Sequence, residues 1–342
     1  MKKINWGIIG LGNIAHKFSK DFDKIENAKL LAVASKEDSK LQKFSKEFNI
    51  EKKFLFKNYQ DLINCDELDI IYIALPNSFH KKWALQAIEN KKNVLLEKPF
   101  ATNFSEALEI SNSLKKNKIF FSEAFMYRYH PQIKTIIEII KNGKIGRLLS
   151  MESYFGINIL TKKKLFFFNK KRKIDPNSRL FNKNLGGGCI LDLGCYPSSF
   201  SLLIGSLTNK IKDSDLKLTN VFKEIGETGV DINSSAELLF SDGFKSKIYA
   251  SFKKNLGNKS IIKGEKGSVI VNNTWLGGDI IHCNDEGSKK IIRFGSDKNI
   301  YNYQIEEINK NLISGSIKTN FPIMSLEETL TNMKIIDNWI NF

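Results

Sequence analysis

Short apolar runs alternate with helix-like stretches over the first 122 residues, and this alternation constrains the fold more than any other feature of the chain. The expected strands are residues 4–9, 29–34, 70–74, 93–96 and 119–122, and the expected helices are residues 14–23, 41–48, 81–90 and 104–114. Repeated strand-helix-strand units build a parallel sheet with helices on both faces. We therefore predict an α/β, doubly wound first domain at residues 1–123.

The pattern changes in the second part of the chain. A helix with an apolar stripe ends near Gly143, and from residue 148 onward most segments resemble strands parted by Gly and Asn turns. Such turns indicate an antiparallel sheet. Ser325 and Glu328 have capping-box spacing and predict a helix that runs to about Asn341. We predict a second, α+β domain at residues 124–342 with a mostly antiparallel sheet.

The chain is strongly basic, with 53 Lys and Arg residues against 37 Asp and Glu and a formal charge of +16. Nucleic acid and anionic membranes are the usual partners of such a composition. Only five of the 53 are arginines, however, and proteins that read nucleic acid depend on the bidentate guanidinium group. A nucleic-acid module is therefore the weaker alternative, and we predict no nucleic-acid partner.

The cysteines and histidines give no sign of a disulfide framework or a metal site. The four cysteines include no C-x-x-C pair, and the four histidines form no cluster with ligand spacing. No apolar run reaches the ~18 residues of a membrane span, and the first residues are unlike a secretion signal. We expect a soluble, cytoplasmic protein with no metal and no membrane partner.

A glycine-rich turn follows the first expected strand directly and opens the first helix. Gly10, Gly12 and Ala15 form the pattern G-x-G-x-x-A. The first glycine allows a tight turn, the second lets a pyrophosphate approach the backbone, and the third small residue allows close helix packing. The helix N-terminus adds unpaired N–H groups. The turn predicts a dinucleotide site; the alternative is a packing turn in a sheet that binds something else.

The residues after the second expected strand bear on the choice of dinucleotide. An acidic residue at that place usually bonds the ribose 2′-hydroxyl of NAD, but Ser35 and Lys36 stand there in this chain. A hydroxyl and a cation suit a 2′-phosphate, so we predict NADP, with NAD as the alternative because Glu37 follows directly. Lys36 is also compatible with an ordinary solvated loop.

Two further segments carry groups suited to chemistry at an oxygen atom. The E-K-P triplet at residues 97–99 follows a buried strand, at the sheet edge where doubly wound folds bind ligands. Residues 185–197 include a run of three consecutive glycines, which lets the backbone pass close to a ligand, followed by Asp192 and Tyr196 at i and i+4 of a helix. A tyrosine can donate a proton to a carbonyl oxygen if a nearby cation, such as Lys98, stabilises the phenolate. An ordinary strand-to-loop turn and an amphipathic helix are the structural alternatives.

These motifs, in this order and spacing, resemble those of the glucose-fructose oxidoreductase and inositol dehydrogenase (Gfo/Idh/MocA) family over nearly the whole chain. Residues 122–131 (SEAFMYRYHP) and 179–181 (RLF) are similar to the branch of dimeric dihydrodiol dehydrogenases and NADP-dependent xylose dehydrogenases. Many family members have histidine where Tyr196 stands, so the proton donor here is expected to be phenolic.

The resemblance implies a Rossmann domain followed by an α+β domain whose open sheet supports dimers or tetramers, with the active site between the two. It implies Lys98 and Tyr196 as the catalytic pair, with Asp192 assisting. The residues expected at the cofactor are Gly10, Gly12, Asn13, Ile14, Ser35, Lys36, Leu75, Pro76, Asn77, His80, Glu97 and Lys98. The residues expected at the substrate are Arg128, Arg179, Asp192 and Tyr196. His80 is equally compatible with a loop histidine.

We therefore expect an NADP-preferring oxidoreductase that passes hydride between nicotinamide and a secondary alcohol or its ketone. The expected substrate is a sugar or polyol-like molecule, and the expected assembly is a homodimer or homotetramer. The alternative is a cofactor-sensing regulatory protein of the same fold, which has no need of the three catalytic residues together. Residues 162–173 carry seven cations around three phenylalanines and either attract an anionic sugar or form a solvated loop.

Overall fold

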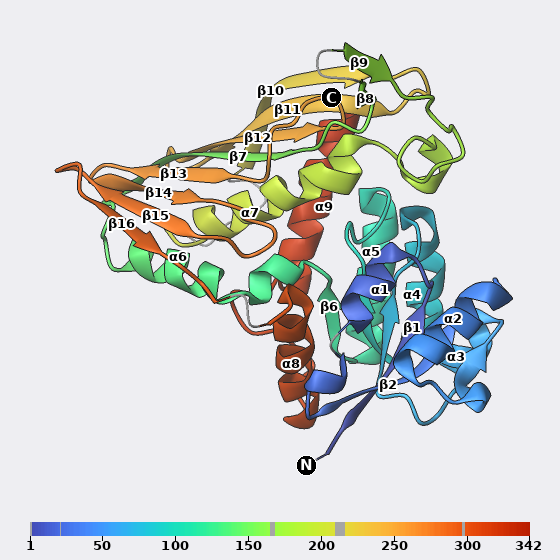
Figure 1. Cartoon of the computed structure of the whole chain (residues 1–342). Coiled ribbons are helices and arrows are strands. Elements are labelled where there is room, and N and C mark those ends of the chain that lie inside the picture. Colours follow the sequence, from blue (N-terminus) through green and yellow to red (C-terminus); the bar gives the residue numbers. More distant parts are fainter. Residues whose placement is uncertain (1, 21, 165–167, 209–215, 296–297) are drawn as a thin grey trace. The chain divides into compact units, whose positions relative to one another are not determined.

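Three points in the chain, after residues 129, 295 and 330, separate two structural units. The computed structural model describes residues 2–20, 22–164, 168–208, 216–295 and 298–342. One unit consists of residues 1–129 and 296–330, and the other of residues 130–295 and 331–342 (Figure 1). Each unit therefore combines a long segment with a distant C-terminal one.

The first unit contains a parallel sheet with the strand order β3-β2-β1-β4-β5-β6. Its strands are β1 (Ile4–Ile9), β2 (Ala28–Ala34), β3 (Leu55–Phe56), β4 (Ile70–Ile73), β5 (Asn93–Leu96) and β6 (Phe121–Glu123). Its helices include α1 (Asn13–Ser19), α2 (Asp38–Phe48), α3 (Tyr59–Ile63), α4 (His80–Glu89), α5 (Phe104–Asn117) and α8 (Ile300–Ile313). This strand order is that of a Rossmann domain, and the predicted doubly wound sheet is confirmed.

Some elements differ from their predicted bounds, for local reasons. The first helix ends at Ser19 rather than Asp23 because the backbone at Lys20 is extended, with ψ 132°. The strand β3 and the helix α3 were not predicted at all. They have two and five residues, which is too short for hydrophobic periodicity to be read.

The helix α8 packs with the Rossmann sheet although it lies almost 300 residues from β1 in the sequence. Trp6 of β1 is fully buried, and its indole Nε1–H donates to Asn309 Oδ1 of α8 at 2.9 Å. The ring of Phe18, in α1, lies 6.0 Å from that of Tyr301. Residues 296–330 accordingly belong to the first unit. The single boundary after residue 123 remains a prediction, and the nearest division in the structure is after residue 129.

The second unit contains an eight-stranded sheet with the order β10-β11-β12-β7-β13-β14-β15-β16 and a two-stranded sheet, β8-β9. The strands are β7 (Leu148–Gly156), β8 (Thr161–Lys164), β9 (Phe168–Lys171), β10 (Leu216–Ile225), β11 (Asp231–Phe240), β12 (Lys245–Ser251), β13 (Ser260–Gly264), β14 (Gly267–Val271), β15 (Ile280–Asn284) and β16 (Lys289–Ile292). Helices α6 (Pro131–Lys141) and α7 (Cys195–Gly205) belong to the same unit. β12 and β7 pair in parallel and the remaining pairs of the large sheet are antiparallel, so the predicted α+β class is confirmed.

The helix α9 (Leu326–Asn341) begins in the first unit and ends in the second. At its start, Ser325 Oγ accepts the Glu328 N–H at 3.1 Å, as the predicted N-cap requires. The Glu328 carboxylate does not close a capping box, because it pairs with Arg128. Near the helix end, Trp339 Nε1–H donates to Ser234 Oγ of β11 at 2.9 Å.

The helix α7 forms much of the core of the second unit, and every one of its residues is buried. A Cβ on its last residue, Gly205, would lie 2.2 Å from the ring of Phe240, so the helix approaches the sheet as closely as glycine permits. Of the described helical stretches, residues 183–205 are long and apolar enough to cross a membrane, but 89% of the apolar window is buried inside the structure. That degree of burial is typical of a core helix.

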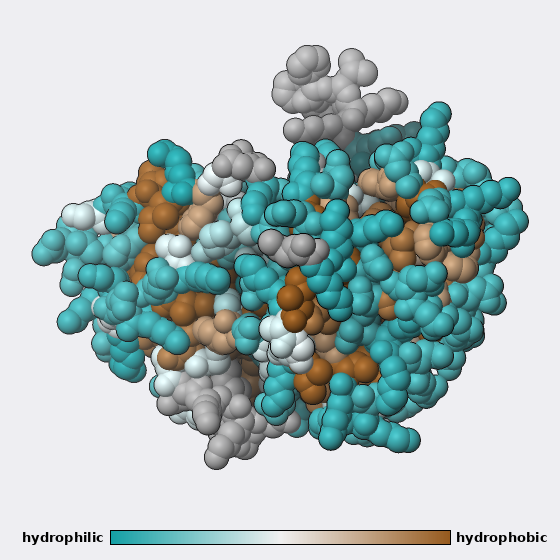
Figure 2. Space-filling view, turned by 90° about the horizontal axis from the view of Figure 1, so that it is seen from below, coloured by the Kyte–Doolittle hydropathy of each residue, from teal (hydrophilic) through white to brown (hydrophobic). Residues whose placement is uncertain are grey.

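The molecular face drawn in Figure 2 is mainly hydrophilic, with hydrophobic patches set among polar side chains. Scattered apolar residues of this kind are normal on a folded protein. The surface is the one expected of a lysine-rich chain whose large apolar side chains fill internal cores.

Candidate active site

The turn between β1 and α1 needs its two glycines for different reasons. Gly10 has φ +91°, and a Cβ there would lie 2.6 Å from the Ala74 carbonyl oxygen. A Cβ on Gly12 would have no atom within 4 Å. Neighbouring protein atoms therefore require Gly10, whereas Gly12 leaves open space at the start of α1. This is the arrangement that an approaching pyrophosphate needs.

The first turn of α1 fits that interpretation. Asn13 and Ile14 are its first residues, and no side chain caps the helix at Gly12. Ala15 is fully buried, which lets the helix pack closely on the sheet. The predicted contacts of Gly12, Asn13 and Ile14 with a dinucleotide remain predictions that this geometry accommodates.

At the end of β2, a small hydrogen-bonded turn carries the residues that bear on NADP. Ser35 is buried, and its Oγ accepts the Glu37 N–H at 3.1 Å. The Glu37 carboxylate pairs with the Lys40 ammonium group at 2.6 Å, in the first turn of α2. Lys36 Nζ lies 5.9 Å from the ring centre of Tyr59. The turn thus presents a hydroxyl and a cation beside a carboxylate that is already ion-paired.

His80 connects the loop after β4 to the loop after β5. Its Nε2 lies 2.9 Å from the Leu75 carbonyl oxygen and its Nδ1 lies 2.9 Å from the Pro99 carbonyl oxygen. Burial lowers the pKa of His80 to about 4, so the ring is neutral and donates one hydrogen bond. These contacts are structural, and the contact of His80 with a cofactor stays a prediction, as do those of the half-buried Leu75 and Pro76 and the buried Asn77.

Glu97 and Lys98 follow β5 directly and differ in their surroundings. Glu97 is buried, and its carboxylate accepts a hydrogen bond from the Tyr72 hydroxyl of β4. Burial, with the negative charge of Glu97, raises the pKa of Tyr301. Lys98 is half-buried. The segment therefore holds its acid inside the unit and leaves its lysine partly exposed.

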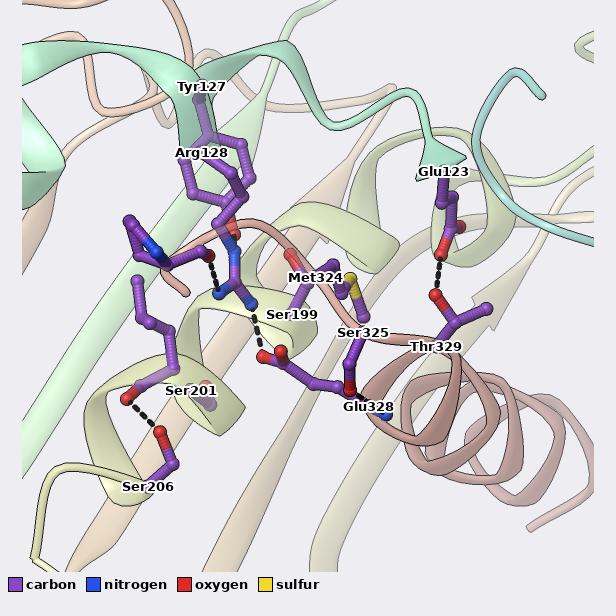
Figure 3. A network of polar contacts seen from close by, with 12 residues as sticks. Glu123, Tyr127, Arg128, Ser199, Ser201, Ser206, Met324, Ser325, Glu328 and Thr329 are labelled. Atoms are coloured by element: carbon purple, nitrogen blue, oxygen red, sulfur yellow. Dashed lines mark hydrogen bonds and ion pairs between the residues drawn. The ribbon is translucent and has the colours of Figure 1, made fainter. Parts of the chain in front are cut away.

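Glu123 lies at the end of β6 with 1% of its surface exposed. One carboxylate oxygen accepts the Phe100 N–H at 2.9 Å, and the other lies 2.9 Å from the Thr329 hydroxyl, which donates to it when the carboxyl is ionised (Figure 3). Burial raises the pKa of Glu123 to about 8, and the protonated acid can donate to Thr329 instead. Because Phe100 follows Lys98 by two residues, Glu123 holds the backbone just beyond the predicted catalytic lysine.

Arg128 is buried in the short helix Met126–Tyr129. Its guanidinium group donates to Glu328 at 2.6 Å, to the Pro322 carbonyl at 3.0 Å and to the Tyr127 hydroxyl at 2.9 Å (Figure 3). Groups of the first unit therefore hold this cation in place. The described contacts are those of a structural ion pair, and contact with a substrate remains a prediction.

In the second unit, contacts within the protein account for the glycine triplet. Gly186 and Gly188 have φ +75° and +116°. A Cβ on Gly187 would lie 2.8 Å from the Leu180 carbonyl oxygen, and one on Gly188 would lie 2.5 Å from Asp231 Oδ1. The sequence analysis connected these glycines with a ligand, but packing inside the unit explains Gly187 and Gly188.

The predicted helix after the glycines begins with an irregular turn. Residues Ile190–Gly194 form a π-helical turn, in which N–H groups bond carbonyls five residues back, and α7 follows. Asp192 lies in this turn, with 13% of its side chain exposed, and accepts a hydrogen bond from Arg179 Nη1 at 3.0 Å. The structure thus brings together two of the residues expected at the substrate.

Tyr196 occupies the first turn of α7 between aromatic neighbours. Its ring lies 5.2 Å from that of Phe155 in an edge-to-face arrangement and 5.5 Å from that of Trp275. Only 5% of the residue is exposed. These contacts restrict the direction of the phenol, which suits a group that must meet one particular substrate atom.

The basic segment 162–173 contains the paired strands β8 and β9, and residues 165–167 lie outside the described residues. Lys171 pairs with Glu227 at 3.1 Å, and both side chains are exposed. Attraction of an anionic sugar by this segment stays a hypothesis.

The cysteines and acids give no indication of a metal centre. All four cysteines are free, and Cys65, Cys189 and Cys195 are buried. Within the described ranges, no group of three or more His, Cys, Asp or Glu side chains is arranged to hold a metal ion.

Sequence reasoning missed two buried groups that hold the E-K-P segment, namely Tyr72 and Glu123. The sequence does contain a hint of their role, because Tyr72 and Glu123 are polar residues that lie within or directly after a run of apolar strand residues. A buried polar group needs a hydrogen-bond partner. The partner, however, cannot be read from the strand itself.

Comparison with known proteins settles the family. Residues 4–125 match a family described as an oxidoreductase family with an NAD-binding Rossmann fold, and residues 133–270 match the GFO/IDH/MocA C-terminal domain. The chain belongs to the Gfo/Idh/MocA family. The predicted family and oxidoreductase class are confirmed, together with a first domain of the NAD-binding type.

Individual relatives agree with the branch that the motifs indicated. A trans-1,2-dihydrobenzene-1,2-diol dehydrogenase from Xenopus tropicalis is 26% identical over 97% of this chain and 96% of its own length. A D-xylose 1-dehydrogenase (NADP(+)) from Hypocrea jecorina is 32% identical over 57% of this chain and 51% of its own length. A solved aldose-aldose oxidoreductase from Caulobacter crescentus has a TM-score of 0.84 at 20% identity, covering 99% of this chain and 97% of that one. This structural likeness shows the fold.

The raised pKa of Glu123 predicts a pH dependence of stability. Between the ordinary pKa of 4.5 and about 8, the folded protein keeps a proton that the unfolded chain has lost. The stabilisation that Glu123 contributes is fully present below pH 4.5. As the pH rises from there to about 8, the free energy of unfolding falls by up to about 1.4 kcal/mol per pH unit. Urea unfolding at several pH values should show this loss in the wild type and not in Glu123→Gln. Parallel pH curves for the two proteins would contradict the assignment.

Proposed function

We propose that this chain is an NADP-preferring dehydrogenase or reductase that acts on a secondary alcohol or ketone of a sugar or polyol-like molecule. The oxidoreductase class follows from its family. The main support for a cofactor site is the open space at Gly12, directly before the uncapped start of α1. Two of the curated relatives are named as dehydrogenases of trans-1,2-dihydrobenzene-1,2-diol and of D-xylose.

The preference for NADP rests on the turn after β2. A 2′-phosphate needs a cation and hydrogen-bond donors, and a nearby unpaired carboxylate would repel it. Lys36 and the hydroxyl of Ser35 provide the first two, and Lys40 neutralises Glu37. The name of the xylose dehydrogenase relative includes NADP(+), which supports the same choice.

In this proposal the residues of the chain hold the reacting oxygen and move its proton. The bound nicotinamide ring supplies or accepts the hydride. Lys98 holds the substrate oxygen, and Tyr196 takes the hydroxyl proton in the oxidation direction and returns it in the reduction direction. A phenol loses its proton near neutral pH only when a cation stabilises the phenolate, and Lys98 has that role.

Asp192 and Arg179 form the polar part of the site in the second unit. Their ion pair at 3.0 Å leaves 54% of the arginine side chain exposed. A carboxylate and a guanidinium group can together accept and donate hydrogen bonds to the hydroxyl groups of a polyol. We assign Asp192 to orienting the substrate or Lys98, and Arg179 to contacting the substrate.

We further propose that the outer face of the large sheet joins two or more copies of the chain. Ile261, Ile270, Ile281 and Ile291 stand opposite one another across four neighbouring strands. The first three are half-buried and Ile291 is 51% exposed. On β13, β14 and β15, the neighbouring residues Ile262, Val269 and Ile280 face the core and are fully buried. A row of outward isoleucines on an open sheet is a suitable surface for a second copy.

The cofactor assignment predicts that NADPH binds more tightly than NADH, as measured by fluorescence titration. Lys36→Asp should weaken NADPH binding by about tenfold or more, because it replaces the cation at the 2′-phosphate with a like charge. Lys245→Asp in β12 makes the same change of net charge and should leave both affinities unchanged. A preference for NADH would contradict the roles of Ser35 and Lys36, and binding of neither would favour the nucleic-acid alternative.

The catalytic assignment predicts large losses of kcat for Tyr196→Phe and Lys98→Ala, on a substrate found by screening sugars, polyols and diketones. Loss of the proton donor or of the oxygen-holding cation should lower kcat about a hundredfold or more, with NADPH binding nearly intact. Tyr303→Phe in α8 removes a phenol outside the proposed site and should keep its activity. An unchanged kcat in Tyr196→Phe would refute the assignment.

The assembly proposal predicts that Ile281→Glu lowers the molar mass of the protein in solution, measured by size-exclusion chromatography with light scattering. A carboxylate in the middle of an apolar interface loses its water without gaining a partner. Ile313→Glu, at an exposed position of α8 in the first unit, should leave the mass unchanged. A wild-type monomer, or an unchanged assembly in Ile281→Glu, would exclude this interface.

A further inference from the structure

Asp231 is a buried carboxylate at the start of β11, and neither the sequence motifs nor the proposed reaction uses it. Its Oδ2 accepts the Ile190 N–H at 2.7 Å. Its Oδ1 lies so close to Gly188 that a Cβ there would approach it to 2.5 Å. The carboxylate therefore lies directly against the backbone that opens the helical run of Asp192 and Tyr196.

This helical run has no side-chain cap of its own. The first N–H groups of a helix lack partners within the helix and are usually satisfied by a side chain just before it. Gly188 has no side chain, and Cys189 makes no capping hydrogen bond. Asp231 supplies the missing acceptor from a strand that lies more than 30 residues later in the sequence. A negative charge is also favourable at a helix N-terminus.

The Asp231 carboxylate accepts hydrogen bonds from the Ile190 N–H and from the backbone N–H and thiol of Cys189, but burying a charge has a desolvation cost. Burial raises the pKa of Asp231, and burial together with the Asp231 charge raises the pKa of the Cys189 thiol well above its ordinary value. An asparagine could accept the same kind of hydrogen bond at a lower desolvation cost. The pairing of β11 with β10 and β12 uses backbone groups and does not need this side chain.

We propose that Asp231 is a positioning residue of the active site. By holding residues 188–190 it sets the start and rotation of the helical run, and so the directions of Asp192 and Tyr196. The turn that it anchors is the π-helical one, a rare kind of turn that is frequent at functional sites. Asp192 follows Ile190 by two residues and must meet Arg179 at 3.0 Å. A displacement of about 1 Å at such a site can cost about a hundredfold in rate.

The expected change in kcat rests on the proposed function, whereas the expected effect on the order of residues 188–197 does not. Asp231→Ala removes the acceptor, whereas Asp231→Asn keeps an oxygen and the volume. Gln132→Leu is the control, because it removes a buried side chain of α6 that bonds the Asn272 and Gly278 carbonyls in the same unit. Three quantities are measured on the full chain: hydrogen exchange of peptides covering 188–197, kcat, and the Kd for NADPH.

In Asp231→Ala we expect exchange in 188–197 to accelerate about tenfold or more and kcat to fall about tenfold or more with NADPH affinity unchanged. Asp231→Asn should recover most of both, and Gln132→Leu should change neither. If the alanine variant does not fold, Asp231→Ser takes its place, because its hydroxyl is too short to reach Ile190.

The outcomes separate the two proposals. The positioning role would be overturned if hydrogen exchange in residues 188–197 were no faster in Asp231→Ala than in Gln132→Leu. It would also be overturned if exchange accelerated in Asp231→Ala while kcat stayed unchanged. If the wild type turns over no substrate, the proposed function fails, and the exchange measurement alone decides whether Asp231 holds this segment.

Discussion

The hydrogen bond from the Phe100 N–H to the buried Glu123 carboxylate is the interaction on which the Lys98 segment depends. A loop at the edge of a parallel sheet has no strand partner for its N–H groups, so its course is set by the acceptor it finds. Thr329 and the nearby Arg128 guanidinium offset only part of the cost of burying Glu123, so its pKa stays raised, and one carboxyl oxygen still accepts the Phe100 N–H when the acid is protonated. In the second unit, the buried Asp231 carboxylate accepts a hydrogen bond from the Ile190 N–H in the same manner. In each unit, then, a buried acid holds the backbone close to a predicted catalytic residue, although the acid itself is not predicted to be catalytic.

Glycines in the two predicted motifs differ in whether protein atoms or open space lie against them. Gly10 and Gly188 have positive φ and lie against a carbonyl oxygen and a carboxylate, so any side chain there would collide with the protein. Gly12 faces open space. The same residue type therefore has opposite meanings in two motifs, and only the neighbouring atoms distinguish a packing glycine from a ligand-facing one.

Much of the fold was predictable because it depends on local pattern. The strand Asn93–Leu96 has its predicted bounds, as does the end of α9 at Asn341, because hydrophobic periodicity and caps act over a few residues. The return of α8 to the first unit was not predictable, since the Trp6 to Asn309 hydrogen bond joins residues 303 apart in sequence. Likewise, nothing in residues 122–131 shows that Arg128 is paired with Glu328 inside the protein.

The sequence by itself determined the family, the doubly wound sheet, the glycine turn at Gly10 and Gly12, and the identities of Lys98, Asp192 and Tyr196 as candidates for chemistry. These follow from residue type and short spacing, which local sterics and hydrogen bonding translate directly into structure. The tertiary structure decided which polar groups are held inside and by what: Glu97 by Tyr72, Arg128 by Glu328, Ile190 by Asp231. Such partners are chosen by burial, because a polar group removed from water must bond whichever complementary group the fold brings to it, however distant in sequence.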